Sequence, residues 1–445
     1  MESEKQYIEL YEQEHDAICA HSAKALNALR EKAFTCFQTN GFPSKKAERY
    51  KYTDMQALFA PNYGVNVNRL DIPVNPYDVF KCDVPNLSTS LYFIVNDAFY
   101  KKVLPKAKLP EGVYVGSLKD YAEDNPEFIS QYYGQIAKNE DSVTALNTMF
   151  AQDGLLVYVP KNVDAERTIQ IINLSRADVD LMMNRRVLIV LEEGAQAKLL
   201  FCDHSVDDQN FLATQVIEAY VGQNAQLDLY CLEETNYKNT RVSNVYFNLD
   251  RDARLNHNVI TLTNGKTRNK VDLVFKGEGA ECSLCGCAIE DKHQHVDNNT
   301  LIDHQVAHCS SHELYKYVLD EQSVGAFAGK VLVRHGAQKT TSNEVNQNLC
   351  TTKEARMFTQ PMLEIYADDV KCSHGSTVGQ LNDTAMFYME QRGISEKEAK
   401  LLLEFAFINE VIDKIQLEPL RDRLHLLVEK RFRGELGSCN DCQLC

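Results

Sequence analysis

The sequence predicts a mainly β fold, a stacked β-helix flanked by helical regions at both ends. One observation is a phrase that returns along the chain: EEGAQAKLL around Ala195, GQNAQLDLY around Ala225, DRDARLNHN around Ala253, GEGAECSLC around Ala280 and RHGAQKTTS around Ala337. Successive alanines lie 30, 28 and 27 residues apart, and the last step of 57 residues spans two periods with a degenerate copy near Val306. Strands at such a period, without intervening helices, indicate a solenoid whose coils cover one another's apolar faces. The other observation is a helical pattern on either side of this repeat.

The N-terminal region, residues 1–150, is predicted to be helical at first and then mixed α/β. From Glu2 to about Ala60, apolar residues recur at intervals of three and four, the spacing of one helical face. They are Tyr7 with Leu10, Ile8 with Tyr11, and then Leu26, Leu29, Ala33 and Phe37. The sequence GFPS at residues 41–44 ends this pattern. From 61 to 140 short apolar runs, such as residues 91–95, alternate with polar loops.

The predicted β-helix core covers residues 151–380. Short β-branched runs, such as LLVYV at 155–159 and RVLIVL at 186–191, are typical of strands. A β-sandwich is the alternative, because its strands also come at regular intervals, of about 8 to 12 residues. Sandwich sheets do not usually repeat a phrase, so the repeat favours the β-helix.

After Gly379 the pattern becomes helical again, which predicts a C-terminal helical domain over residues 381–437. The step Arg392-Gly393 resembles a helix stop, and Ser395 with Glu398 three residues later predicts an N-cap and a capping box. Residues 438–445 form a cysteine-rich tail with the spacing C-x-x-C-x-x-C. Its thiols could hold iron or zinc with a fourth ligand from elsewhere, or the tail could simply be solvated. These thiols belong to Cys439, Cys442 and Cys445.

Composition excludes several classes of protein. The 445 residues include 47 Lys and Arg against 63 Asp and Glu, a net charge of −16 that argues against a nucleic-acid partner. No run of 18 apolar residues occurs, so a membrane span is not expected. The amino terminus, MESEKQYIELYEQEHDAICAH, is charged and lacks the apolar core of a signal peptide. The 14 cysteines are therefore expected to be thiols of a cytoplasmic protein.

The triplet Gly-Lys-Thr at residues 265–267 does not make a nucleotide site. A phosphate loop needs a glycine five positions before its second glycine, and Ile260 stands there. We therefore expect this chain to bind no nucleotide itself, and any ATP to be bound by a partner.

Two groups of soft side chains have a functional and a structural interpretation. Residues four apart on a straight strand share a face but lie some 13 Å apart, too far for one metal ion. Metal binding and hydrogen bonding along a β-helix wall both stay open for His293, His295, His304, His308, Cys309 and His312.

In the sequence ECSLCGC, strand alternation places Cys285 and Cys287 on one face and Cys282 on the other. They could be small core residues or a relay for sulfur.

Cys372 and His374 are the main candidates for chemistry, because they lie two residues apart where the β region gives way to helices. Alternate side chains of a strand share a face, so the thiol and the imidazole could point the same way. Such borderline-soft ligands suit iron or a persulfide better than magnesium or calcium. The structural alternative is a buried thiol beside an imidazole that caps the strand end.

Three stretches give the chain a marked resemblance to a known family. They are GFP at 41–43 through YKYT at 50–53, ALNT at 145–148 with DG at 153–154, and LEIYADDVKCSHG at 363–375. From about residue 40 to 435 the chain resembles the SufB/SufD scaffold family of the Suf iron-sulfur cluster assembly system, and the SufD branch more closely than SufB. Ser373, His374 and Gly375 stand where SufB-like chains tend to carry an acidic residue beside the histidine.

The resemblance implies a right-handed parallel β-helix between helical ends, a SufB-like scaffold partner paired through the β-helices, and a SufC-like ATPase on the C-terminal helices. It further implies a transient iron-sulfur cluster shared with the partner, formed at the seam where His374 lies, with Cys372 beside it. Apolar residues of the C-terminal helices would contact the ATPase, although much of this pattern is expected to be helix core. They are Phe387, Tyr388, Leu402, Phe405 and Phe407.

The sequence thus favours a non-enzymatic scaffold subunit for iron-sulfur cluster assembly. Two other functions are weighed against it. One is a structural adaptor that binds the ATPase without touching iron or sulfur. The other is a β-helix polysaccharide lyase or hydrolase, which would usually carry an export signal and a cleft of paired acids or bases, and neither can be located in the sequence.

Overall fold

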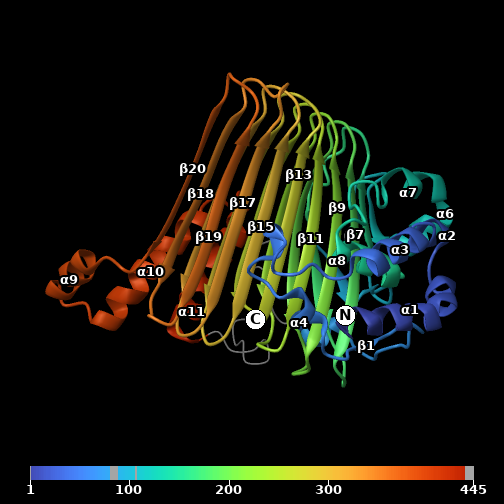
Figure 1. The fold of residues 1–445 in the computed structure, drawn as a ribbon, viewed down its shortest axis with the longest axis horizontal. Coiled ribbons are helices and arrows are strands. Elements are labelled where there is room, and N and C mark those ends of the chain that lie inside the picture. Colours follow the sequence, from blue (N-terminus) through green and yellow to red (C-terminus); the bar gives the residue numbers. More distant parts are fainter. Residues whose placement is uncertain (1, 81–88, 106–107, 436–445) are drawn as a thin grey trace.

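The centre of the molecule is a parallel β-solenoid, seen in the computed structural model, which describes residues 2–80, 89–105 and 108–435 (Figure 1). Consecutive strands alternate between two sheets, so that each coil contributes one strand to each sheet. The odd-numbered sheet contains β5 (Leu155–Val159), β7 (Leu181–Leu191), β9 (Phe211–Val221), β11 (Thr240–Leu249), β13 (Lys266–Phe275), β15 (His295–His304), β17 (Val324–Val333) and β19 (Arg356–Ile365). The even-numbered sheet contains β6 (Thr168–Ser175), β8 (Gln196–Ser205), β10 (Gln226–Glu234), β12 (Arg254–Thr263), β14 (Glu281–Glu290), β16 (Ser310–Leu319), β18 (Thr341–Cys350) and β20 (Lys371–Gly379).

Every pairing between successive coils is parallel, and the register is continuous apart from one shift between Glu233 and Glu234 of β10, which confirms the β-helix and excludes the sandwich. A recurring alanine occupies the corner in four successive coils, at Ala195, Ala225, Ala253 and Ala280. Gln196, Gln226 and Arg254 are register neighbours, and the alanine before each is at most 1 % exposed. A corner this tight has room only for a small side chain. The next two corners are Cys309 and Thr340, three residues after the predicted Val306 and Ala337 respectively, and each is 1 % exposed.

The interior of the solenoid is mostly apolar and comes from alternate residues of each strand. The same alternation explains the positions of the three cysteines of β14. Cys282 packs inside the coils with residues such as Leu229 and Phe247. Cys285 and Cys287 lie on the outer face, beneath the C-terminal helices. The predicted division of the three thiols between two faces is therefore confirmed.

The N-terminal region caps one end of the solenoid and covers part of the odd-numbered sheet (Figure 1). Its helices are α1 (Glu2–Ala20), α2 (Lys24–Asn27), α3 (Arg30–Asn40), α4 (Met55–Phe59), α5 (Pro76–Val79), α6 (Leu118–Asp124), α7 (Pro126–Tyr132) and α8 (Ser142–Phe150), with a 3₁₀ turn at Glu48–Tyr50. Its short strands are β1 (Gly64–Val65), β2 (Thr89–Val95), β3 (Ala98–Phe99) and β4 (Tyr114–Ser117), which extend the two sheets. The α8 helix packs on β7, β9 and β11, and Asn147 donates from Nδ2 to the Arg185 carbonyl at 3.0 Å.

Three helices follow β20: α9 (Asp383–Gln391), α10 (Glu396–Ile412) and α11 (Glu418–Arg433). The predicted helix stop is Gly393, whose φ is 86°, and the predicted N-cap is Ser395, whose hydroxyl accepts from the Glu398 amide at 3.3 Å. The Glu398 carboxylate does not complete the box, because it accepts from the Arg433 guanidinium at 2.9 and 3.2 Å. The α10 helix returns to pack on β14 and β16, whereas α9 projects from the body (Figure 1).

None of the helices in the described parts of the chain is long and apolar enough to cross a membrane.

Candidate functional site

The strand β20 ends the solenoid, and the candidate residues Cys372 and His374 lie on it. It pairs with β18 on one side only, and no described strand occupies its other edge. Nearly all of its side chains are exposed. An unpaired strand edge offers a row of free backbone donors and acceptors, which is a template for another chain. The molecule therefore has a closed end, under the N-terminal helices, and an open end at β19 and β20.

Cys372 and His374 point to the same side of β20, as strand alternation predicts. In register, Cys372 lies beside Ser342 and His374 beside Glu344, and both of these β18 residues are buried in the solenoid. Cys372 is half-buried against residues such as Val331, and burial raises the pKa of its thiol. The His374 side chain is exposed. The last coil thus offers a partly shielded thiol and a solvent-accessible imidazole on its inward-facing side.

Behind His374 runs a row of interior residues that contains two carboxylates. Glu344 is the register neighbour of His374, and Glu313 is the neighbour of Glu344. Both carboxylates are buried, with exposures of 0 % and 3 % respectively. Burial, and then the nearby Glu313, raise the pKa of Glu344 to about 9, and burial raises the pKa of Glu313 to about 7. Neither carboxylate was predicted from the sequence, although the steps along the row, 30 residues from His374 to Glu344 and 31 from Glu344 to Glu313, match the coil period.

The His and Cys group around His304 does not form a metal centre. Within the described ranges, no three His, Cys, Asp or Glu side chains converge to hold a metal ion. The His304 ring lies in the core against Phe275, with centroids 4.5 Å apart, and its Nε2 is 3.0 Å from the Ser311 hydroxyl. Burial lowers the pKa of His304 to about 4. The structural alternative, a hydrogen-bonded imidazole in the wall, therefore describes His304.

The three cysteines of β14 are poorly suited to relay sulfur. All three are buried, and burial raises the pKa of each thiol, that of Cys287 to about 12. Because the thiolate is the nucleophile, thiols of this kind are unreactive near neutral pH. The tail thiols Cys439, Cys442 and Cys445 lie outside the described residues.

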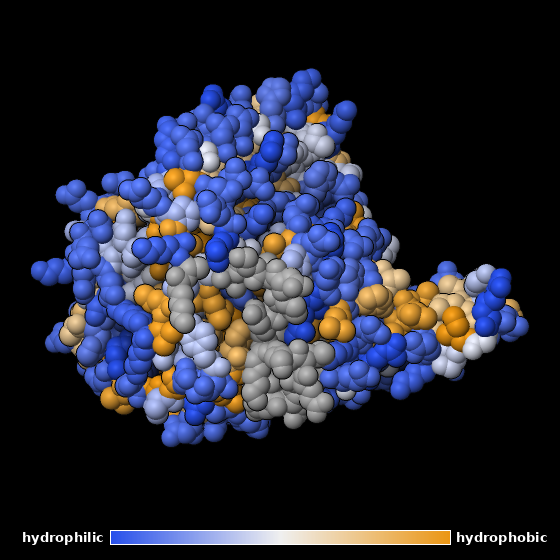
Figure 2. All heavy atoms as spheres, turned by 180° about the vertical axis from the view of Figure 1, so that it is seen from behind, coloured by the Kyte–Doolittle hydropathy of each residue, from blue (hydrophilic) through white to orange (hydrophobic). Residues whose placement is uncertain are grey.

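The expected ATPase-contacting residues fall into two groups. Phe387, Tyr388 and Leu402 are 61 %, 59 % and 37 % exposed. Phe405 and Phe407 are partly buried against the cluster that joins α10 and α11 to the solenoid. Figure 2 shows apolar side chains gathered along the projecting arm of α9 and the beginning of α10.

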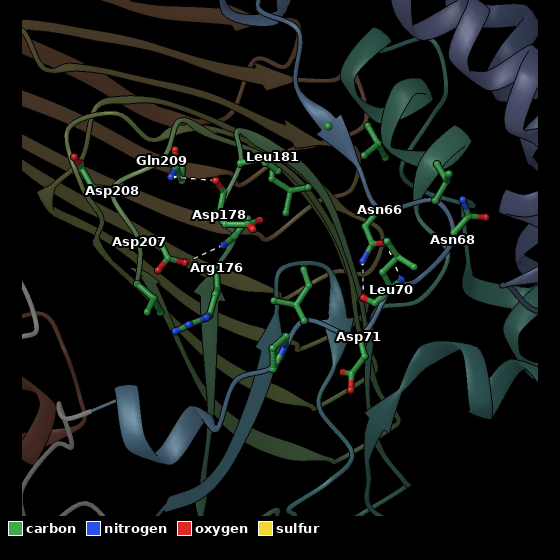
Figure 3. A pocket seen from close by; sticks show the side chains of 18 residues that line it. Asn66, Asn68, Leu70, Asp71, Arg176, Asp178, Leu181, Asp207, Asp208 and Gln209 are labelled. Atoms are coloured by element: carbon green, nitrogen blue, oxygen red, sulfur yellow. Dashed lines mark hydrogen bonds between the residues drawn. The ribbon is translucent and has the colours of Figure 1, made fainter.

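A separate hollow of about 950 Å³ lies near the closed end, and nothing in the sequence had indicated it. It is bounded by residues 64–73 on one side and by the turns at 176–181 and 206–209 on the other (Figure 3). The Asn66 side chain bridges its own segment, accepting from the Leu70 amide at 2.8 Å, while Asp207 accepts from the Ala177 amide at 2.9 Å. These two polar groups therefore bind backbone within the walls of the hollow.

Two family models match consecutive parts of the chain. The SufBD protein N-terminal region matches residues 1–171, and the SufBD core domain of the SUF system for FeS cluster assembly matches residues 173–407. The chain belongs to the SufBD family. The N-terminal match begins well before residue 40, where the resemblance found in the sequence began, and the core-domain match includes both Cys372 and His374.

Individual relatives in the SufBD family span most of this chain. An iron-sulfur cluster assembly SufBD family protein of Synechocystis sp. is 28% identical over 405 residues, which are 87% of each chain. The iron-sulfur cluster assembly protein SufD of Escherichia coli is 26% identical over 88% of this chain and 90% of its own length. The protein of the same name in Bacillus subtilis is 21% identical over 97% and 98% of the two chains. The protein is therefore a member of an iron-sulfur cluster assembly system.

Proposed function

We propose that this chain is a non-enzymatic, SufD-type scaffold subunit on which iron and sulfide are joined into a cluster. It would pair with a SufB-like subunit and bind a SufC-like ATPase. The observation that carries the proposal is the placement of His374: an exposed imidazole, beside a half-buried thiol, on the unpaired strand that ends the solenoid.

Pairing with a second scaffold is supported by the open end itself. The free edge of β20 could continue its sheet into a partner strand. Apolar side chains near this end are unusually exposed, with Ile365 at 40 %, Tyr366 at 47 % and Val378 at 49 %. A partner with a similar open coil would cover both the edge and these side chains. His374 would then lie at the seam between the two subunits.

ATPase binding is supported by the arm of α9 and the beginning of α10. No residue of α9 is buried, although the helix carries Phe387 and Tyr388. Exposed aromatic residues on an isolated helix are typical of a surface that a partner covers. The sequence also lacks a phosphate loop, so the nucleotide would be bound by the partner.

The cluster would be transient because this chain contributes few ligands. One imidazole and one thiol leave most coordination positions to sulfide and to the partner subunit. The ten cysteines of the described residues are all free thiols, as expected for assembly in the cytoplasm.

Anaerobic reconstitution of the complex tests this function. The purified chain, its scaffold partner and the ATPase receive ferrous iron, sulfide and ATP, and iron is counted in the isolated complex. We expect His374→Ala to lower cluster-bound iron at least tenfold while leaving co-purification of the three subunits unchanged. The control is His293→Ala, which removes an exposed imidazole in the turn before β15 and should keep full iron content.

The two other functions give different results in this experiment. Full iron content in His374→Ala would refute the role of this residue. An adaptor would bring the ATPase into the complex without any dependence of iron on His374. A carbohydrate-active enzyme would release reducing sugar from polysaccharide and would not co-purify with the assembly subunits.

A further inference from the structure

The row of interior residues that ends at His374 becomes acidic near the open end of the solenoid. Register pairs connect Leu229, His257, Leu284, Glu313 and Glu344 in succession, one residue per coil. The outermost pair connects Glu344 to His374. Neighbouring strands lie about 4.8 Å apart, so residues in this row are stacked directly on one another. An apolar row thus becomes acidic over its last two buried coils.

Among the residues that the structure describes, no cationic side chain or hydrogen-bond donor balances a charge on Glu344. Both of its carboxylate oxygens are buried without a hydrogen-bond donor among the described residues. The charged group that acts on it most is Glu313, another carboxylate, and no cationic side chain contributes. A buried carboxyl group without such partners is disfavoured in its charged form, in agreement with the raised pKa of Glu344. Its two oxygens are nonetheless of the type that binds a cation.

The opposite wall of the solenoid makes room for this carboxylate. Gly329 of β17 faces it, and a Cβ at that position would lie 2.3 Å from Glu344 Oε1. The glycine therefore allows the carboxylate to extend across the interior, one coil below the exposed His374. Only the last coil separates Glu344 from the open end.

We propose that Glu344 and His374 together bind a ferrous ion at the open end of the solenoid, before it is joined to sulfide. The inference rests on the proposed function, in which iron is a substrate delivered to this end. A carboxylate and an imidazole form the mixed oxygen and nitrogen donor set that suits divalent iron. Two donors from this chain leave the other positions to water, sulfide or the partner subunit. The ion would supply the partner that Glu344 lacks among the described residues, in exchange for the proton that its raised pKa retains near neutral pH.

Anaerobic titration of the purified, full-length chain with ferrous iron tests the proposal, with equilibrium dialysis as the readout. We expect Glu344→Gln to weaken binding roughly ten- to a hundredfold, the range typical for disturbing a metal site, and His374→Ala to weaken it similarly. Cobalt(II) as a second probe should lose the same visible absorption bands in both variants. Unchanged iron affinity and unchanged cobalt bands in Glu344→Gln would overturn the proposal.

The matched control is Glu290→Gln, at the end of β14. Glu290 is equally buried, at 1 % exposure, and its carboxylate oxygens also lack hydrogen-bond partners in the described structure, but it lies on another row. The Glu290→Gln variant should bind ferrous iron with the same affinity as the unaltered chain. If Glu290→Gln and Glu344→Gln weakened iron binding equally, the replacement of any buried carboxyl group would explain the effect, and the proposal would fail. Thermal melting of each variant verifies that it is folded before titration.

Binding and assembly can fail separately. Iron bound at Glu344 by a chain that forms no cluster with its partners would contradict the proposed function and leave this inference standing. A Glu344→Gln variant that binds iron with unchanged affinity and forms clusters normally would contradict this inference and leave the proposed function standing.

Discussion

At the scale of single residues, burial decides which titratable groups are available for chemistry. His374 and Cys372 occupy the last coil, where one is exposed and the other half-buried. On the two register rows that run inward from these residues, His257 and Cys282 are fully buried and carry shifted pKa values. Along these rows, the coil in which a side chain lies separates the candidate site from groups that only fill the core.

His257 gives a prediction about pH. Burial lowers its pKa to about 4 from the ordinary 6.5, and its Nδ1 lies 3.2 Å from the Leu229 carbonyl oxygen. Between these pH values the unfolded chain is protonated at this residue and the folded chain is not, so stability falls as the pH falls from about 6.5 to about 4. The contribution is about 1.4 kcal/mol for each pH unit. We expect His257→Leu, which matches Leu229 and Leu284 in its row, to reduce this slope.

Urea unfolding at a series of pH values measures that slope. The unaltered chain provides the reference, since other groups titrate in the same window and are common to both proteins. A slope that is the same with and without His257 would show that this imidazole is protonated in the folded state.

The sequence predicts the face of a strand on which a residue lies, but not which residues of different coils are neighbours. The opposite faces of Cys282 and Cys285 were predictable, because they need only the period of two within one strand. The position of Glu344 beside His374 was not predicted, because it depends on the register between coils. That register follows from the repeat only when each corner is located, and the corners at Cys309 and Thr340 lack the alanine that marks the four before them.

At the scale of elements, the C-terminal helices are attached to the solenoid at a defined point. Arg431 of α11 donates to the Leu262 carbonyl at 2.7 Å and the Ile289 carbonyl at 3.3 Å. It also pairs with Asp291 at 2.9 Å, and its side chain is only 9% exposed. Apolar residues of α10 and α11 pack on β14 and β16 around this arginine. The arm that carries α9 is therefore anchored to a rigid body.

We expect Arg431→Ala to destabilise the attachment by about 2 to 4 kcal/mol, because buried acceptors lose their donor. Limited proteolysis should then cut the C-terminal helices before the solenoid. The control is Arg433→Ala on the same helix, whose guanidinium is 32% exposed and pairs with Glu398 and Glu429. Surface pairs contribute up to about 1 kcal/mol, so this variant should be cut at nearly the unaltered rate. Equal rates for the two variants would contradict the anchoring role.

Elements were predictable where a local pattern sets them. The Gly393 stop and the Ser395 cap follow from residue types at fixed spacing, and both are present. The predicted second bond of the capping box, from the N-cap amide to the Glu398 carboxylate, is absent. That carboxylate instead accepts a hydrogen bond from Arg433 of the next helix, 35 residues later in the chain. Long-range partners of this kind leave no mark in a local pattern.

At the scale of the whole molecule, the solenoid has unlike ends. Helices cover the end where the chain begins, whereas β19 and β20 end the other without a covering strand in the described residues (Figure 1). The repeat in the sequence predicted the stack, but it could not show which end stays open. That depends on the irregular N-terminal region, whose packing on β7, β9 and β11 follows no repeat.

The central claim is that the open end is the seam with a second scaffold subunit, and amide hydrogen exchange of β20 tests it most directly. In the isolated chain, amides on the free edge of Lys371–Gly379 should exchange rapidly. Adding the SufB-like partner should slow their exchange by at least tenfold, while amides of β7 and β9 stay unchanged. Protection that appears elsewhere in the complex and leaves β20 exchanging as fast as before would contradict the account.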